Sequence, residues 1–214
     1  MKIIAINGSP RKDWNTATLL KKALNGASSK GAETELINLY DLKFQGCVSC
    51  FACKRKDKEH GVCALEDELL PVLKSINSAD GLILGSPIYL MSVTSGMFAF
   101  LERFVFSNMI YSDTIPTVFP KKIPSAFIYT MNITEEQFEE IALKPKLEAT
   151  SGFLEWVLGI EPETLFAYNT YQFSDYSKYE SSIFSEPEKA AYKAAHFPLD
   201  CQAAIDMGVK VAGK

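Results

Sequence analysis

Short apolar segments alternate with helical patterns along the whole chain, and this alternation constrains the fold more than any other feature. Four segments are short, apolar and rich in β-branched or aromatic residues, which predicts strands at 2–7, 81–85, 125–130 and 164–168. Residues 33–39 alternate between polar and apolar and predict a second, more exposed strand. Elsewhere apolar residues recur at three- and four-residue steps, which predicts helices over 19–27, 67–76, 94–106, 134–142, around Leu154, 186–195 and 199–211. Each strand–helix pair spans about 30–45 residues, the scale of βαβ units.

This order of elements predicts an α/β fold built on a doubly wound, five-stranded parallel sheet. Right-handed crossovers place helices on both faces of such a sheet. No internal repeat and no linker rich in proline, glycine or serine divides the chain, so residues 1–214 are expected to form a single domain. Ligands of these sheets bind beyond the carboxyl ends of the strands. We therefore expect the site in the loops after the first, third and fourth strands.

Composition and charge exclude several classes of protein. Apolar residues make up 47% of the chain, enough to build a core, so a disordered or low-complexity chain is excluded. The formal charge of −4 argues against nucleic-acid binding, which needs a basic surface. No apolar run approaches the roughly 18–20 residues that cross a bilayer, and the segment 1–6 is too short for a signal peptide. We expect a cytoplasmic protein with neither a membrane nor a nucleic-acid partner.

The loop after the first strand, residues 8–16, joins a buried strand to a helix N-terminus. Free backbone N–H groups and the positive end of the helix dipole favour a phosphate at such a place. Four side chains in the loop can donate hydrogen bonds to it: Ser9, Arg11, Asn15 and Thr16. The loop has neither the Walker spacing nor the Gly-x-Gly-x-x-Gly of dinucleotide sites. The alternative is a polar loop in which Asn15 or Thr16 caps the helix.

The opening of the chain resembles the flavodoxin-like NADPH-dependent FMN reductase family, which includes the iron–sulfur flavoproteins. The resemblance rests on Gly8-Ser9-Pro10-Arg11, on Asn15-Thr16 and on the leucine-rich helix that follows, and it extends over residues 1–132. It implies the flavodoxin-like strand order 2-1-3-4-5. It also implies FMN as the cofactor, NAD(P)H as co-substrate, and an FMN phosphate held by Ser9, Arg11, Asn15 and Thr16.

Two further loops match the family where it contacts the flavin ring. In the loop after the third strand, Pro87 stiffens the turn and Tyr89 offers a ring for stacking. The alternative is a strand-ending turn with Tyr89 at the edge of the core. The resemblance implies that the ring is contacted here by Ser86, Pro87, Ile88, Tyr89 and Leu90. It further places Thr130, Met131 and Asn132, after the fourth strand, in the family's third flavin loop.

Four of the five cysteines cluster in residues 46–64, which we call the cysteine loop. Cys47, Cys50 and Cys53 have the spacing with which thiolates converge on an iron–sulfur cluster, and Cys63 is the candidate fourth ligand. The motif resembles that of the iron–sulfur flavoproteins, except that nine residues separate Cys53 from Cys63, a longer gap than is usual there. Three interpretations stay open: a 4Fe–4S cluster, a zinc or redox-thiol site, and a packed loop of free thiols. For zinc, His60 can replace one cysteine as a ligand.

We predict an FMN-dependent NAD(P)H oxidoreductase, because a flavin carries the chemistry and no nucleophile or general base is recognisable. The electron acceptor is a quinone, a nitro or azo compound, a flavin or a protein. One alternative is an iron–sulfur flavoprotein electron carrier that couples FMN to a 4Fe–4S cluster. The other is a non-catalytic flavodoxin-like carrier.

Two segments lie outside the motifs. The long connection 106–120 carries Phe106, Tyr111 and Phe119, which we expect to cover the flavin or to contact a second subunit. The C-terminal residues 185–214 are expected to form a helical tail. Apolar residues in excess near the predicted site favour a homo-oligomer, either a dimer or a tetramer.

Overall fold

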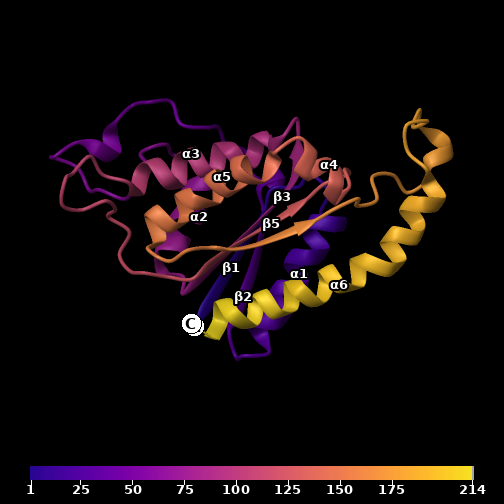
Figure 1. Cartoon of the computed structure of the whole chain (residues 1–214). Helices are drawn as coiled ribbons and strands as arrows, with labels where there is room; N and C mark the ends of the chain where they lie inside the picture. The colour runs from indigo at the N-terminus through magenta and orange to yellow at the C-terminus, as the bar shows by residue number, and fades with distance from the viewer. Residues whose placement is uncertain (214) are drawn as a thin grey trace.

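The computed structural model describes residues 1–213 and has the predicted α/β architecture. A parallel sheet with the order β2-β1-β3-β5-β6 lies between two layers of helices (Figure 1). Its strands are β1 (Lys2–Asn7), β2 (Glu33–Asn38), β3 (Gly81–Tyr89), β5 (Ser125–Thr130) and β6 (Glu163–Ala167). Counted along the chain without the short β4, this is the order 2-1-3-4-5, so the predicted fold class is confirmed.

The sheet has one strand more than predicted. β4 (Ser92–Val93) pairs antiparallel with the end of β3 through a two-residue turn. Leu90 and Met91 form this turn with φ angles of 48° and 61°. Turns with positive φ at both central residues usually contain asparagine or glycine, so a Leu-Met pair gives no sequence signal for a hairpin. The hairpin extends β3 beyond the sheet at its carboxyl end.

The helices form one layer on each face of the sheet (Figure 1). One layer holds α1 (Asn15–Ser28) and α6 (Glu186–Gly213). The other holds α2 (Leu69–Ser78), α3 (Ser95–Asn108), α4 (Glu135–Glu140) and α5 (Leu143–Leu158). Three single 3₁₀ turns lie in the connections, at Leu39–Asp41, Ala52–Lys54 and Tyr176–Lys178. None of the helices within residues 1–213 combines the length and apolar character that a membrane crossing requires.

Alternate residues of β1 explain why this strand is apolar throughout. Ile3 and Ala5 pack into the core beneath α1 and α6, whereas Ile4 and Ile6 pack into the core beneath α2, α3 and α5. A strand covered by helices on both faces has no side that can be polar. β1 therefore lies in the middle of the sheet, and its carboxyl end carries the loop that resembles the FMN reductases.

The C-terminal helix differs from the prediction of two segments, 186–195 and 199–211. α6 is one helix of 28 residues with Pro198 inside it. A proline in a helix removes one hydrogen bond and crowds the preceding turn, at a cost of about 3 kcal/mol. The second half of α6 buries Ala204, Met207 and Val211 in the core that it shares with α1 and one face of the sheet. This burial outweighs the cost of the proline, so the helix continues through it.

We expect Gly208→Ala to lower the free energy of unfolding by about 3 kcal/mol or more, because α1 and α6 meet there through their backbones. A Cβ on Gly208 would lie 1.8 Å from the carbonyl oxygen of Ala23. Gly152→Ala in α5 is the matched control, since its Cβ would meet no atom within 4 Å. That change should raise stability by roughly 0.5–1 kcal/mol. Urea unfolding of both variants measures the difference, and equal stabilities would contradict this account of the helix pair.

Candidate functional site

One pocket opens at the carboxyl ends of β1, β3, β5 and β6. Ten of the twelve residues predicted to bind the cofactor line it: Ser9, Arg11, Asn15, Thr16, Pro87, Ile88, Tyr89, Thr130, Met131 and Asn132. Three loops that are distant in sequence therefore meet at one place, because parallel strands end at the same edge of the sheet. We call this cavity the edge pocket.

The other two predicted residues lie outside the edge pocket. Ser86 is fully buried, and its hydroxyl donates to the Pro87 carbonyl oxygen (2.8 Å) and accepts from the Thr94 amide (3.0 Å). It therefore fixes the turn and the start of α3. Leu90 is 99% exposed at the tip of the β3–β4 hairpin. These two side chains thus lie outside the pocket that their neighbours line, because the turn directs one into the core and the other into solvent. Their contact with a cofactor stays a prediction.

The edge pocket contains an uncapped helix N-terminus. Trp14 occupies the N-cap position of α1 without a capping side chain, and the first turn, all of it described, has no acidic residue. The alternative that Asn15 or Thr16 caps the helix is wrong. Asn15 Nδ2 donates to the Tyr171 carbonyl oxygen (2.8 Å), and the Thr16 hydroxyl pairs with that of Thr130 (2.7 Å). The end of α1 is left free for an acceptor from outside the chain.

The charge of the edge pocket is positive. Of the described residues that line it, only Arg11 carries a formal charge. Its backbone amide donates to the Ser9 hydroxyl (3.1 Å), and the Ser9 amide donates to Asn7 Oδ1 (3.0 Å), so the loop is held in one conformation. Positive charge, a fixed loop and a helix N-terminus together favour an anion.

A fourth loop, after β6, lines the edge pocket and was not predicted. It contributes Thr170, Tyr171 and Gln172, and Trp14 joins them from the first loop. The Tyr171 carbonyl oxygen accepts from the Trp14 ring nitrogen (2.9 Å), and that of Gln172 accepts from Arg11 (2.5 Å). These are backbone acceptors in an irregular segment, so no residue type marks them. The one available signal is position, since β6 also ends at this edge.

Asn132 in the edge pocket is only partly satisfied. Its Nδ2 donates to Gln172 Oε1 (3.0 Å). Its Oδ1 is buried and has no hydrogen-bond partner among the described residues. A buried acceptor without a donor is unusual in proteins. In a pocket, it indicates a place for a donor on a ligand.

Lys189 of α6 supports the edge pocket from behind. Its ammonium donates to the Asn132 carbonyl oxygen (3.0 Å) and to Asn169 Oδ1 (2.5 Å), and it lies 5.1 Å from the centre of the Phe184 ring. The residue is 4% exposed, and this burial lowers the pKa of Lys189 to about 8. A buried lysine that joins two site loops across more than fifty residues of sequence leaves no local pattern, so it was not predicted.

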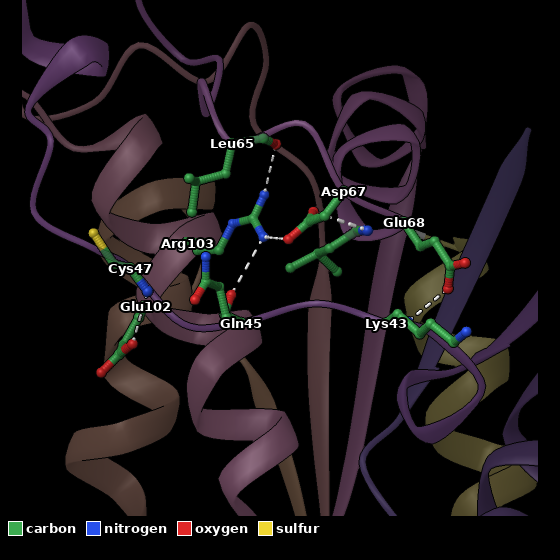
Figure 2. A network of polar contacts seen from close by, with 9 residues as sticks. Lys43, Gln45, Cys47, Leu65, Asp67, Glu68, Glu102 and Arg103 are labelled. Carbon is green, nitrogen blue, oxygen red and sulfur yellow. Dashed lines mark hydrogen bonds and ion pairs between the residues drawn. The ribbon is translucent and has the colours of Figure 1, made fainter.

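The four cysteines of the cysteine loop line a second, small cavity against α3. Arg103 and Phe106 of α3 complete its walls. The loop is fixed at its start by Glu102, whose carboxylate accepts from the Cys47 amide at 3.0 Å (Figure 2). His60 lies outside the cavity and its Nε2 contacts the Arg55 carbonyl oxygen (3.0 Å). Within residues 1–213, no three His, Cys, Asp or Glu side chains are arranged around a common point as ligands of one metal ion.

A lysine lies beside this second cavity. Burial raises the pKa of the Cys53 thiol, although the neighbouring ammonium of Lys54 acts in the opposite direction. Burial also lowers the pKa of Lys54, whose Nζ donates to the carbonyl oxygens of Phe106 and Met109 and lies 4.3 Å from the Phe106 ring centre. The cavity thus has positive charge close to its thiols.

The aromatic residues of the 106–120 connection do not cover the edge pocket. Phe119 is buried in the core against Phe104, with ring centres 6.1 Å apart. Phe106 contacts Phe51 of the cysteine loop (5.9 Å), and Tyr111 is largely exposed beside Phe106. These side chains lie away from the edge pocket because the connection runs beside the cysteine loop. Their contact with a flavin or a second subunit stays a prediction.

Comparison with known proteins identifies the family. Residues 1–117, more than half of the chain, match the sequence profile of the family described as NADPH-dependent FMN reductase. The chain belongs to this family. The predicted family is thus confirmed.

Curated proteins that are similar to this chain include iron–sulfur flavoproteins. One from Methanocaldococcus jannaschii is 41% identical over 103 residues, which cover 48% of this chain and 51% of the relative. One from Methanosarcina thermophila is 30% identical over 105 residues, 49% of this chain and 53% of the relative. The chain thus spans about half the length of the curated relatives it matches. These relatives confirm the predicted branch of the family.

Solved structures of this fold include more distant relatives. An NAD(P)H:quinone oxidoreductase from Methanothermobacter marburgensis superposes with a TM-score of 0.71 at 14% identity, over 98% of this chain and 96% of that chain. An azoreductase from Bacillus anthracis superposes with a TM-score of 0.64 at 12% identity, over 98% of this chain and 99% of that chain. At these identities the likeness shows the shared fold.

We expect Lys189 to make the free energy of unfolding rise between pH 8 and pH 10.5. The unfolded chain keeps this lysine protonated up to its ordinary pKa of 10.5, whereas the folded protein releases the proton near pH 8. The folded state binds fewer protons in this window, so stability increases with pH by at most about 1.4 kcal/mol per pH unit. Lys189→Met should remove this increment. Lys193→Met, which changes an exposed lysine one turn along α6, should keep the increment. Urea unfolding at several pH values measures both variants, and identical pH profiles would contradict the lowered pKa of Lys189.

Proposed function

We propose that the edge pocket binds FMN and that the protein transfers electrons from NAD(P)H to a small-molecule or protein acceptor. The observation that carries the proposal is the convergence of ten predicted residues, from three separate loops, on one pocket at an uncapped helix N-terminus. The family name supports NADPH as the donor. FMN supplies the hydride and electron chemistry when bound, and the protein supplies its position and surroundings.

The proposed role of the first loop is to bind the FMN phosphate. The amides of the first turn of α1 have no capping side chain, so a phosphate oxygen satisfies them. Arg11 adds a formal positive charge, while Ser9, Asn15 and Thr16 add short donors. Arg11 and Asn15 now donate to the Gln172 and Tyr171 carbonyl oxygens, and a bound phosphate would take over these donors.

The proposed role of the β3 and β5 loops is to hold the rest of the flavin. Asn132 Oδ1 needs a donor, and the ribityl hydroxyls and the ring N–H of FMN are donors of that kind. Tyr89 is partly exposed at the pocket wall and offers an aromatic face to the flat ring. Lys189 positions Asn132 by donating a hydrogen bond to the backbone carbonyl oxygen of Asn132.

A homo-oligomer stays a proposal that the surface beside the pocket supports. Four apolar side chains are exposed around the β3–β4 hairpin and the start of α3: Tyr89, Leu90, Met91 and Phe98. Exposed apolar residues that gather at one place favour an interface. Tyr89 also lines the edge pocket, so a second copy placed there would adjoin it.

We expect Arg11→Met to weaken FMN binding by about 10- to 100-fold, the worth of a charge-assisted hydrogen bond to a phosphate. Binding of riboflavin, which lacks the phosphate, should change little. Lys12→Met is the matched control, because Lys12 pairs with Asp41 outside the pocket. Flavin fluorescence titrations measure the affinities.

Stopped-flow mixing of the FMN-loaded protein with NADPH and NADH then tests the reaction. Bleaching of the bound flavin on a turnover timescale supports the oxidoreductase. Two results would contradict the proposal: FMN affinity that is equal in Arg11→Met and Lys12→Met, or a bound flavin that neither nicotinamide reduces. The second result would leave a flavodoxin-like carrier.

As a second function, we propose that the cysteine loop binds a 4Fe–4S cluster that exchanges electrons with the flavin. Two observations favour it. All four cysteines line one cavity despite the long interval before Cys63, and the curated relatives are named iron–sulfur flavoproteins. Four thiols are the donor set that such clusters use, each thiolate binding a different iron. The basic side chains of Lys54 and Arg103 at the cavity suit the negative charge of thiolate-bound iron.

We expect anaerobically reconstituted protein to contain about four irons per chain. Cys63→Ala should lose most of this iron, because it removes the fourth ligand. Cys201→Ala, which changes the partly buried cysteine of α6, should keep it. Iron and sulfide analysis gives the comparison. Iron contents that do not differ between the two variants would exclude Cys63 as a ligand.

A further inference from the structure

Arg103 joins the two ends of the cysteine loop. Its side chain is fully buried on α3. One terminal nitrogen donates to the Gln45 carbonyl oxygen (3.3 Å) and to the Asp67 carboxylate, and the other donates to the Leu65 carbonyl oxygen (3.1 Å), as Figure 2 shows. Gln45 precedes the first cysteine of the loop and Leu65 follows the last. One guanidinium therefore binds the chain at both ends of the cysteine loop.

Glu102, the preceding residue of α3, holds the same base from the other side. Its Oε2 accepts from the Cys47 amide, and a Cβ on Gly46 would lie 2.4 Å from this oxygen. A side chain at position 46 would therefore displace the Glu102 carboxylate from this contact. Two consecutive residues of a helix thus hold the beginning and the end of the loop.

The third nitrogen of Arg103 has no acceptor. Nε is buried and makes no hydrogen bond to any described residue. Arg103 lines the cavity that the four cysteines share, and the guanidinium interacts with the thiol of Cys63. A thiol sulfur is a weak acceptor, whereas the sulfur of a thiolate is a better one because it is anionic. A buried N–H that lacks a partner needs an explanation, and an anionic sulfur in the adjoining cavity provides it.

We propose that Arg103 is the positioning residue of the cysteine loop. Its terminal nitrogens hold the base of the loop so that Cys63 meets the other three cysteines, and its free Nε–H donates to the Cys63 sulfur when that sulfur is a thiolate ligand. The second part rests on the cluster proposed above. The proposal explains why the long interval before Cys63 is tolerated: the ends of the loop are fixed by α3 and not by the loop's own length.

A purely structural ion pair between Arg103 and Asp67 is the competing explanation. It predicts lower stability on mutation and no effect on the sulfur. A hydrogen bond to a cluster sulfur stabilises the reduced, more negative state and raises the reduction potential. The potential therefore separates the two explanations.

Arg103→Lys is the decisive variant, because it keeps the charge and removes the Nε–H. Anaerobically reconstituted Arg103→Lys should retain iron and have a more negative cluster potential than the wild type. A tenfold change in the preference for the reduced state corresponds to 59 mV for a one-electron couple. Arg55→Lys is the matched control, since Arg55 lies exposed in the same loop and pairs with Asp57. It should leave the potential unchanged in redox titration.

The iron-free protein tests the positioning itself. Dibromobimane, which joins two nearby thiols, should cross-link Cys63 to one of the first three cysteines in the wild-type chain. Arg103→Met should reduce this cross-link several-fold, as peptide mapping shows, while Arg55→Met should not. If Arg103→Met does not fold, the cross-link and potential of Arg103→Lys decide alone.

The outcomes separate the two proposals. An unchanged potential in Arg103→Lys together with unchanged cross-linking overturns the role of Arg103. If the folded wild type takes up no iron, the cluster proposal and the Nε–H bond fail. Loss of the cross-link in Arg103→Met then still supports the positioning of Cys63 by Arg103, and an unchanged cross-link rejects it.

Discussion

The free N-terminus of α1 is the constraint on which the proposed flavin site depends. Amides in the first turn of a helix have no partner within the helix, and neither Trp14 nor the side chains after it cap this one. The chain could have used Asn15 or Thr16 for this purpose, but both bond across the edge pocket to other loops. The helix end is thus left for an anion, and the loops that surround it are tied to one another.

The sequence predicted the parts of the fold and site that depend on local patterns. β1 and β5 have the predicted bounds because a strand buried on both faces is a continuous apolar run between polar ends. The residues of the edge pocket were predicted from the positions of these strands, since the carboxyl ends of parallel strands all lie at one edge of the sheet. Ser9 and Asn132 are distant in sequence, but both come directly after such strands, so they lie in one pocket.

What the sequence did not reveal depends on contacts between distant residues or on unusual backbone. Leu90 and Met91 form a turn that these residue types rarely make, and such backbone strain is often found at functional sites. Lys189 and Arg103 act through carbonyl oxygens of other segments, and any residue type supplies a carbonyl oxygen. No spacing or composition records such a bond, so only the folded arrangement shows it.

α3 links the edge pocket to the cysteine cavity. At its N-terminus, the hydroxyl of Thr94 donates to the Gly8 carbonyl oxygen (2.6 Å) and caps the Met97 amide, so the helix is anchored to the first loop. Further along, Arg103 holds the cysteine loop. A helix rises 1.5 Å per residue, so these two anchors are about 14 Å apart along its axis. Both anchors lie on one helix, so α3 connects the first loop of the edge pocket to the two ends of the cysteine loop.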